Sequence, residues 1–195
     1  MQILNEEPLI ELHEQYISDV ESAELIALAR PNLQRALVSS AKAGTESKGR
    51  TGANCWLKHN VSPVVQTLCQ RISDQVGIPL LNAESLQMIY YNETQEYAPH
   101  FDAWLADSES GQRCMARGGQ RLVTCLLYLN DVERGGGTIF PKLKLEVDAR
   151  KGRLLIFRNC HPGTNQRHPH SLHGGMPVLS GEKWACNLWF RERKY

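Results

Sequence analysis

The chain has 195 residues, enough for one domain with a sizeable hydrophobic core. Its formal net charge of +1 gives no electrostatic basis for binding nucleic acid or an anionic membrane, and its apolar runs are too short to span a bilayer. The six scattered cysteines form no Cys-x-x-Cys pair, and the N-terminus lacks the pattern of a secretory signal. We therefore expect reduced thiols and a cytoplasmic protein.

The N-terminal part of the chain predicts a short strand and a helix. Tyr16 and Ile17 indicate an edge strand. Ser18 then begins a helix, because Ser18 and Glu21 have the spacing of a capping box. Pro31 is expected to end this helix. The expected apolar face comprises Val20, Leu25, Ile26 and Leu28.

A polar loop and a second helix follow. Residues 39–54 are rich in Ser, Gly, Lys and Thr, which is typical of a mobile surface loop, and such a loop could close over a ligand. The second helix begins at Ser62-Pro63 and ends at Gly77. Its apolar stripe, at four-residue spacing, is Val64, Leu68, Ile72 and Val76. Both helices are expected to pack against a sheet.

From residue 86 onward the pattern changes to short strands separated by turns. The expected strands are 86–91, 121–130, 138–141 and 153–158, with a terminal hairpin of 171–179 and 182–191. Residues 105–120 and 159–170 are expected to be loops. Helices followed by many short strands predict an α+β chain with a barrel or jelly-roll core. We expect one domain over 1–195, with a helical flank and loop over 1–83 and the β core over 84–195.

A candidate metal site follows the first of these strands. In extended backbone, residues two apart point to the same side, so His100 and Asp102 could aim an imidazole and a carboxylate at one ion. A third ligand is needed, and His173 is a candidate. Two histidines and one carboxylate on one face of a metal are typical of non-haem Fe(II) oxygenases.

Other interpretations of these histidines remain open at this level. A His-x-Asp pair arises often by chance, and taken alone it is better explained as a surface ion pair. The third ligand is ambiguous because several histidines lie near His173, namely His161, His168 and His170. A zinc site formed by His168, His170 and His173 is an alternative, although no cysteines accompany it at zinc-finger spacing.

Lys183 strengthens the oxygenase interpretation. It follows His173 across the Ser180-Gly181 turn, and a hairpin there would place it on the strand beside His173. A lysine that points into a barrel is costly unless an anion pairs with it. A dicarboxylic co-substrate would supply that anion at one end and chelate iron at the other. The alternative is an exposed lysine on the hairpin.

These residues resemble the prolyl 4-hydroxylases of the Fe(II)- and 2-oxoglutarate-dependent dioxygenase superfamily. The resemblance rests on five motifs in order, at 91–102, 118–131, 132–141, 151–157 and 171–184. The first has the form Tyr91-x5-Tyr97-x2-His100-x-Asp102, and the last contains both His173 and Lys183. Residues 16–26 and the segment from Arg50 to Leu57 also match, so the resemblance covers nearly the whole chain.

The resemblance implies a double-stranded β-helix with flanking N-terminal helices. It implies that His100, Asp102 and His173 bind iron and that Lys183 binds the distal carboxylate of 2-oxoglutarate. Further assignments by the same resemblance are Tyr91 and Thr138 for 2-oxoglutarate, and Tyr97, Arg121 and Trp189 for the substrate. Barrel packing is the alternative for Tyr97 and Trp189, and a surface ion pair for Arg121.

Three departures from the family pattern affect the expected substrate rather than the iron set. Tyr90 stands where relatives often have Arg, and Thr94 or its neighbour stands where they usually have Gly. Arg158 and Asn159 follow Phe157, where relatives often have an aromatic residue. We expect all of these positions to border the mouth of the pocket.

The implied reaction resembles that of procollagen-proline 4-dioxygenase. It uses Fe(II), 2-oxoglutarate and O2, with ascorbate as a candidate further cofactor, and releases succinate and CO2. The expected partner is a proline-containing peptide or protein, since extended proline-rich chains are pre-ordered for binding in a groove. No nucleic acid or membrane partner is expected. Two alternatives remain: the same chemistry on free proline or another amino-acid side chain, and a non-catalytic β-helix module that binds metal or a carboxylate.

Overall fold

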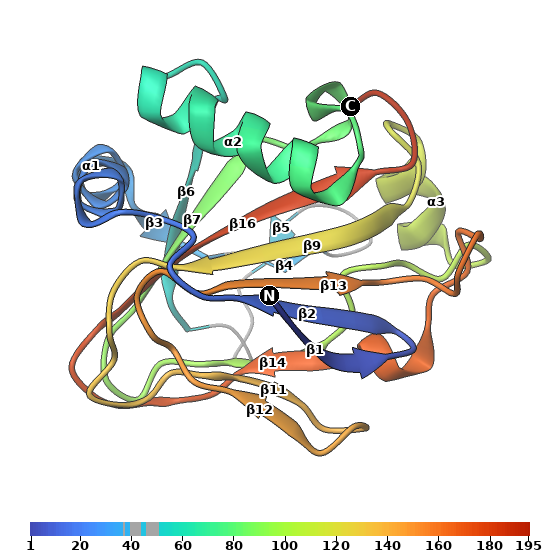
Figure 1. Ribbon diagram of the computed structural model, residues 1–195. Helices are drawn as coiled ribbons and strands as arrows, with labels where there is room; N and C mark the ends of the chain where they lie inside the picture. The colour runs from blue at the N-terminus through green and yellow to red at the C-terminus, as the bar shows by residue number, and fades with distance from the viewer. Residues whose placement is uncertain (37, 40–43, 46–50) are drawn as a thin grey trace.

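Two antiparallel sheets face each other in the computed structural model (Figure 1), which describes residues 1–36, 38–39, 44–45 and 51–195, the two short pairs by backbone alone. The larger sheet has the order β1 (Gln2–Glu6), β2 (Leu9–His13), β13 (Leu154–Arg158), β9 (Arg121–Tyr128), β16 (Lys183–Arg191), β7 (Leu86–Tyr91), β6 (Ala53–Leu57) and β3 (Gln34–Arg35). The smaller sheet has the order β12 (Leu145–Val147), β11 (Thr138–Phe140), β14 (His173–Gly175) and β8 (Tyr97–His100). The predicted jelly-roll core is confirmed.

Two short pairs of strands complete the β structure: β10 (Arg134–Gly135) with β15 (Val178–Ser180), and β4 (Val38–Ser39) with β5 (Gly44–Thr45). The closure predicted for the loop at 39–54 falls largely on residues outside the described ranges. The first 83 residues contribute β1, β2, β3 and β6 to the larger sheet, so a boundary at residue 83 does not separate helices from strands.

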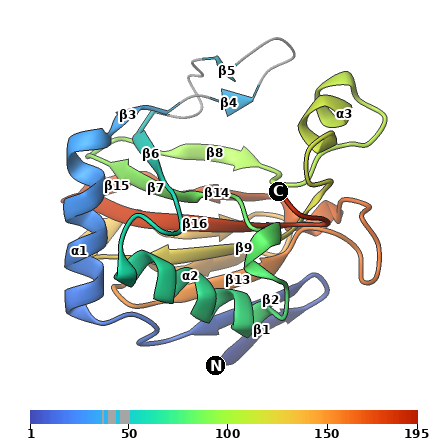
Figure 2. The ribbon, with the colours of Figure 1, turned by 90° about the horizontal axis from the view of Figure 1, so that it is seen from above.

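Helices α1 (Asp19–Ala29) and α2 (Pro63–Val76) lie over the outer face of the larger sheet (Figure 2). The capping box predicted at Ser18 is present, and Ser62 caps α2, whose C-cap Gly77 adopts the left-handed conformation that glycine tolerates best. Two predicted core positions are wrong. Val20 is exposed, and the buried side of α1 is formed by Ser22, Leu25 and Ala29. In α2 the core contains Val65 in place of Val64.

The central strands of the larger sheet are buried on both faces, which explains their nearly continuous apolar sequences. In β16, Trp184, Cys186, Leu188 and Phe190 join the core beneath the helices. The alternate residues of this strand face the space between the sheets, where Lys183, Asn187 and Trp189 line a cavity. The period of two along one strand therefore separates core residues from candidate site residues.

Three predicted elements differ in the structure. The edge strand at Tyr16 and Ile17 is wrong, because the edge is formed by the β1–β2 hairpin before them. The loop at 105–120 contains a further helix, α3 (Glu109–Met115). The terminal hairpin is also wrong: β15 pairs with β10, whereas β16 crosses to the larger sheet and pairs with β7 and β9.

All six cysteines are free thiols, as the sequence predicted. Within the described part of the chain, no helix is both long and apolar enough to cross a membrane.

Candidate active site

His100, Asp102 and His173 converge between the two sheets. His100 ends β8 and His173 begins β14, and these two residues are paired across the strands. Asp102 lies two residues beyond β8 and is buried. Its carboxylate oxygens lie 3.7 Å from His100 Nε2 and 3.5 Å from His173 Nε2. These separations fit an ion held between the three groups, since metal bonds to such atoms are about 2.0–2.2 Å long.

The backbone sets the tautomer of both histidines. His100 Nδ1 donates to the carbonyl of Ala98, and His173 Nδ1 donates to the carbonyl of Ser171, each at 2.9 Å. A neutral imidazole with its proton on Nδ1 keeps a lone pair on Nε2, the atom that faces Asp102. Burial lowers the pKa of His173 to about 4, despite the attraction of Asp102. The site is thus preorganised as a metal-binding group.

Two side chains of the larger sheet hold the Asp102 carboxylate. Trp189 Nε1 donates to Oδ2 at 2.9 Å, and the Thr124 hydroxyl donates to the same atom at 2.7 Å. Asn159 Nδ2 donates in turn to the Thr124 hydroxyl at 2.9 Å. Burial alone would raise the pKa of Asp102, but the nearby histidines and Arg121 hold it well below its ordinary value. The carboxylate is therefore ionised and fixed in orientation.

Lys183 lies in the same cavity, which has a volume of about 730 Å³. Lys183 is paired with Tyr91 across β16 and β7, rather than with the strand of His173. It is only 3% exposed, and burial lowers its pKa to about 7. Its Nζ lies 5.4 Å from the ring centroid of Tyr128, whose hydroxyl donates to Thr138 at 2.6 Å. The prediction of an inward-pointing lysine is correct, although the predicted hairpin is not.

The cavity is suited to an anionic ligand beside a metal. No described side chain forms an ion pair with Lys183, so its ammonium lacks the counter-ion that burial requires. On the same wall, Asn187 Oδ1 is buried without a hydrogen-bond partner among the described atoms. Tyr91 and Thr138 also line the cavity. The structure thus brings together Lys183 and the two residues predicted to accompany it.

Tyr97, Arg121 and Trp189 all line this cavity near the metal-binding group. The Tyr97 ring stacks on His100 with ring centroids 3.6 Å apart. The Arg121 guanidinium lies 3.8 Å from the Trp189 ring centroid and 3.9 Å from Asp102 Oδ1. Arg121 is not a surface ion pair, because its partner Glu84 is buried and binds it through two hydrogen bonds of 2.6 and 2.9 Å.

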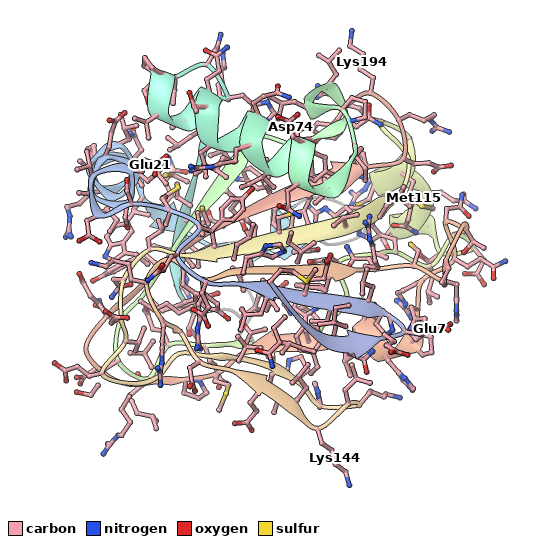
Figure 3. All side chains as sticks on the ribbon, viewed as in Figure 1. Glu7, Glu21, Asp74, Met115, Lys144 and Lys194 are labelled. Carbon is pink, nitrogen blue, oxygen red and sulfur yellow. The ribbon has the colours of Figure 1, made fainter. Side chains whose placement is uncertain are left out.

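A second group of metal-binding residue types, Glu7, His161 and His168, lies where the β1–β2 hairpin meets the loop before β14; Glu7 is labelled in Figure 3. Glu7 Oε1 lies 3.7 Å from His168 Nε2. However, His168 Nδ1 accepts a hydrogen bond from the backbone N–H of His170, which leaves the proton of the neutral ring on Nε2. That proton faces Glu7, so Nε2 has no lone pair for an ion.

The zinc alternative from the sequence is therefore wrong. His173 belongs to the group with His100 and Asp102, whereas His168 lies beside Glu7 and His161.

The departures from the family pattern occupy different environments. Tyr90 packs against Trp184 on the outer side of the sheet, so its expected place at the pocket mouth is wrong. Thr94 has a φ of +66°, a conformation that glycine adopts at lower cost. Asn159 is fully buried beneath Thr124 rather than at the mouth. It reaches the Asp102 carboxylate through that hydroxyl.

Sequence reasoning missed several residues of the site. Thr124, Tyr128 and Asn187 stand as polar residues within apolar strands, and that interruption was the available signal. Glu84 lies just before β7, outside any apolar run that would mark it, yet its carboxylate accepts hydrogen bonds from both Arg121 and Arg191.

Comparison with known proteins supports the same assignment. Residues 86–191 match the family model described as the 2OG-Fe(II) oxygenase superfamily. A prolyl 4-hydroxylase homologue of Acanthamoeba polyphaga mimivirus is 40% identical over 92% of this chain and 72% of its own length. Prolyl 4-hydroxylase 5 of Arabidopsis thaliana is 32% identical over 100% of this chain and 72% of its own.

Solved structures agree. The 2OG complex of the viral collagen prolyl hydroxylase of Paramecium bursaria Chlorella virus-1 matches with a TM-score of 0.75 and 28% identity, covering 93% of this chain and 95% of that one. The chain therefore belongs to the prolyl 4-hydroxylase family of the 2OG-Fe(II) oxygenase superfamily.

Proposed function

We propose that the chain hydroxylates prolyl residues of a peptide or protein, using Fe(II), 2-oxoglutarate and O2 and releasing succinate and CO2. The observation that carries this proposal is the convergence of His100, Asp102 and His173 in the cavity that also holds Lys183, which is buried without an ion-pair partner among the described residues. A metal-binding group and a desolvated cation in one cavity suit a chelating dicarboxylate.

His100 and His173 would hold iron through Nε2, and Asp102 through its carboxylate. When bound, iron and 2-oxoglutarate supply the oxidising chemistry, which no side chain can provide. Lys183 would bind the distal carboxylate, with Tyr91 and Thr138 beside it. In this low-dielectric setting the ion pair is strong, and it offsets the desolvation that lowers the pKa of Lys183.

The residues around the metal-binding group would hold its ligands in a fixed orientation and keep water away from them. Trp189 and Thr124 fix the Asp102 carboxylate by hydrogen bonds. Tyr97 covers one face of His100, and Phe157 lies edge-on to His173 at 4.6 Å between ring centroids. Tyr97, Arg121 and Trp189 are the proposed substrate contacts, because they line the cavity beside the metal-binding group.

A polypeptide substrate is favoured over free proline. Trp56 lines the cavity, is half exposed, and has its ring 5.8 Å from that of Trp189. An exposed aromatic wall is typical of surfaces that bind extended proline-rich chains. The viral protein that this chain resembles is named a collagen prolyl hydroxylase. Ascorbate as a further cofactor and a cytoplasmic location stay predictions from the sequence.

The test is succinate formation in air with Fe(II), 2-oxoglutarate and a proline-rich peptide, with the peptide followed by mass spectrometry. We expect succinate and a peptide that gains one oxygen atom, both lost in Asp102→Ala, with folding checked by circular dichroism. Succinate without a hydroxylated peptide would contradict the substrate assignment. If well-folded, iron-loaded protein forms neither product, the non-catalytic alternative is correct.

A further inference from the structure

A second pocket, of about 1090 Å³, lies beside the active-site cavity. We call it the basic pocket, because five cationic side chains line it: Lys58, Arg113, Arg117, Arg121 and Arg191. Arg113 lies in helix α3, and Arg117 lies in the turn that follows it. Figures 1 and 2 show α3 at the same end of the molecule as the C-terminus, and Met115 at the end of this helix is labelled in Figure 3.

The positive charge of this pocket is not neutralised by its own carboxylate. Among the described residues that line the basic pocket, Glu84 alone has an acidic side chain. Both of its oxygens are already bound: Arg121 donates to each of them, and Arg191 Nε donates to Oε1 at 2.7 Å. Two guanidinium groups therefore share one carboxylate, and the exposed Lys58 and Arg117 extend the positive surface outward.

Two aromatic rings of the pocket, those of Tyr195 and Trp104, stack against its arginines. The Arg117 guanidinium lies 4.3 Å from the Tyr195 ring centroid, and Arg191 lies 4.6 Å from that of Trp104. A Cβ atom at Gly118 would lie 2.9 Å from the Tyr195 ring, so glycine allows this close packing. Arg191 is buried and already donates to Glu84 and to the carbonyls of Cys114 and Gly119. Arg117 is exposed, and a guanidinium group stacked on a ring in this way can still offer its N–H edge to a carboxylate at a lower entropic cost.

The basic pocket is continuous with the active-site cavity. Both are lined by Trp56, Lys58, Asn60 and Arg121. Arg121 contacts Glu84 on one side and lies 3.9 Å from Asp102 on the other. The Arg121 side chain thus lies between the basic pocket and the metal-binding group. A polypeptide with a proline in the cavity could continue into it within a few residues, since an extended chain advances about 3.1 Å per residue.

We propose that the basic pocket binds an aspartate or glutamate side chain of the substrate polypeptide, close in sequence to the hydroxylated proline. This proposal rests on the proposed function, because it assigns the pocket to the substrate of the same reaction. The pocket would act as a specificity determinant: proline sets the residue at the metal, and a neighbouring acidic residue selects among proline-containing chains.

The first experiment compares fluorescently labelled peptides with one central proline and a single Asp or Asn at each position from four before to four after it. Binding is measured by fluorescence anisotropy and hydroxylation by mass spectrometry, both on the intact chain. We expect Asp to lower the Kd about tenfold relative to Asn at one or two positions. The preference should shrink as salt is raised, because the outer cations are exposed.

The second experiment reverses one charge of the pocket. Arg117→Glu should abolish or invert the preference for Asp over Asn, because it places a carboxylate beside the incoming one. Arg150→Glu is the matched control, since Arg150 is exposed on the β12–β13 turn beside Asp148, outside both pockets. The same change of net charge there should leave the Asp/Asn ratio as in the parent protein. Thermal melting establishes that both variants are folded.

The outcomes separate this proposal from the proposed function. Equal binding of Asp and Asn peptides at every position overturns the acidic subsite, even if the peptides are hydroxylated. An Asp preference that survives Arg117→Glu also overturns it. An Asp preference that depends on Arg117, in peptides that are never hydroxylated, supports the subsite and contradicts the proposed function.

Discussion

At His100 and His173, backbone carbonyls decide which ring nitrogen can bind a metal. Each carbonyl takes the Nδ1 proton and leaves the Nε2 lone pair facing Asp102. At His168 the backbone N–H of His170 donates to Nδ1, so the ring proton is on Nε2 and no lone pair remains there. Two clusters with similar residue types thus differ in chemistry because of one hydrogen bond each.

This contrast predicts one tightly bound Fe(II) per chain. Asp102→Ala should remove that ion, whereas Glu7→Ala should leave the stoichiometry unchanged, because the second cluster offers no lone pair on His168. Anaerobic calorimetric titration with Fe(II) or Mn(II) measures both values. A second equivalent of comparable affinity that disappears in Glu7→Ala would refute the tautomer argument.

Burial of Lys183 is costly without a ligand, as its lowered pKa indicates. We predict that Lys183→Met raises the KM for 2-oxoglutarate by at least about 100-fold, since the pairing charge is lost inside a dry cavity. The same change should stabilise the ligand-free protein by on the order of 1–4 kcal/mol, because an unpaired buried charge is removed. Steady-state kinetics and urea unfolding measure the two effects. Lys151→Met, at a surface ion pair with Asp19, is the control and should alter neither.

The pKa of Lys183 also predicts a pH dependence. It falls from 10.5 to about 7 in the folded protein. Between these values the unfolded chain binds more protons at this residue, so its contribution to the free energy of unfolding rises from pH 7 to pH 10.5 in the ligand-free state. A bound carboxylate favours the ammonium, so 2-oxoglutarate affinity should fall as pH rises above about 7. Calorimetry across this range tests both signs, and a flat affinity profile would argue against an ion pair.

At the scale of elements, strands of the larger sheet orient a ligand carried by the smaller one. Thr124 from β9 and Trp189 from β16 both donate to Asp102, which follows β8. The alternation of these strands places their apolar residues under the helices and their polar residues in the cavity.

Removing one of these donors should weaken the metal site without unfolding the sheet. Thr124→Val leaves Asp102 with one donor fewer and Asn159 without its acceptor, and we expect a loss of about 10–100-fold in metal affinity or kcat. Thr124→Ser keeps the hydroxyl and should retain most of both. The comparison of metal affinity in the two variants decides whether the hydrogen bond or the side-chain volume matters.

The sequence predicted the elements that carry local signals and failed where tertiary contacts decide. Ser18 and Ser62 cap helices through contacts within one turn, so both starts were predictable. Helix α3 spans only seven residues and includes Gly111, so its weak pattern read as a loop. The Ser180-Gly181 turn indicated a hairpin, yet β15 and β16 enter different sheets, a choice made by their distant partners.

The site was predictable in part. Spacing alone indicated only His100 and Asp102, whereas the resemblance to prolyl 4-hydroxylases implied His173 and Lys183, and the structure brings all four together. The support from Thr124, Asn159 and Trp189 was not predictable, because those hydrogen bonds join residues far apart in the sequence.

At the scale of the whole molecule, the cavity lies between the two sheets. His100 and His173 belong to the smaller sheet, whereas Lys183 and Tyr91 belong to the larger one. A ligand that spans metal and lysine therefore links both layers. The fold places the two ends of one dicarboxylate on separate layers of the sandwich.

This geometry predicts that 2-oxoglutarate stabilises the entire fold when a divalent metal is present. At a concentration 100 times its Kd, the ligand should add about 2.7 kcal/mol to the free energy of unfolding. Anaerobic thermal melting with Mn(II) measures the shift, which should vanish in Lys183→Met. A rise in Tm that persists in that variant would place the ligand elsewhere.

The central claim is that this chain couples 2-oxoglutarate decarboxylation to hydroxylation of a peptidyl proline. The most direct measurement is turnover under ¹⁸O2 with a proline-rich peptide, followed by mass spectrometry of both products. The account predicts one labelled oxygen atom in succinate and one on the proline ring, in equal amounts. An unlabelled hydroxyl group, or labelled succinate with an unmodified peptide, would contradict it.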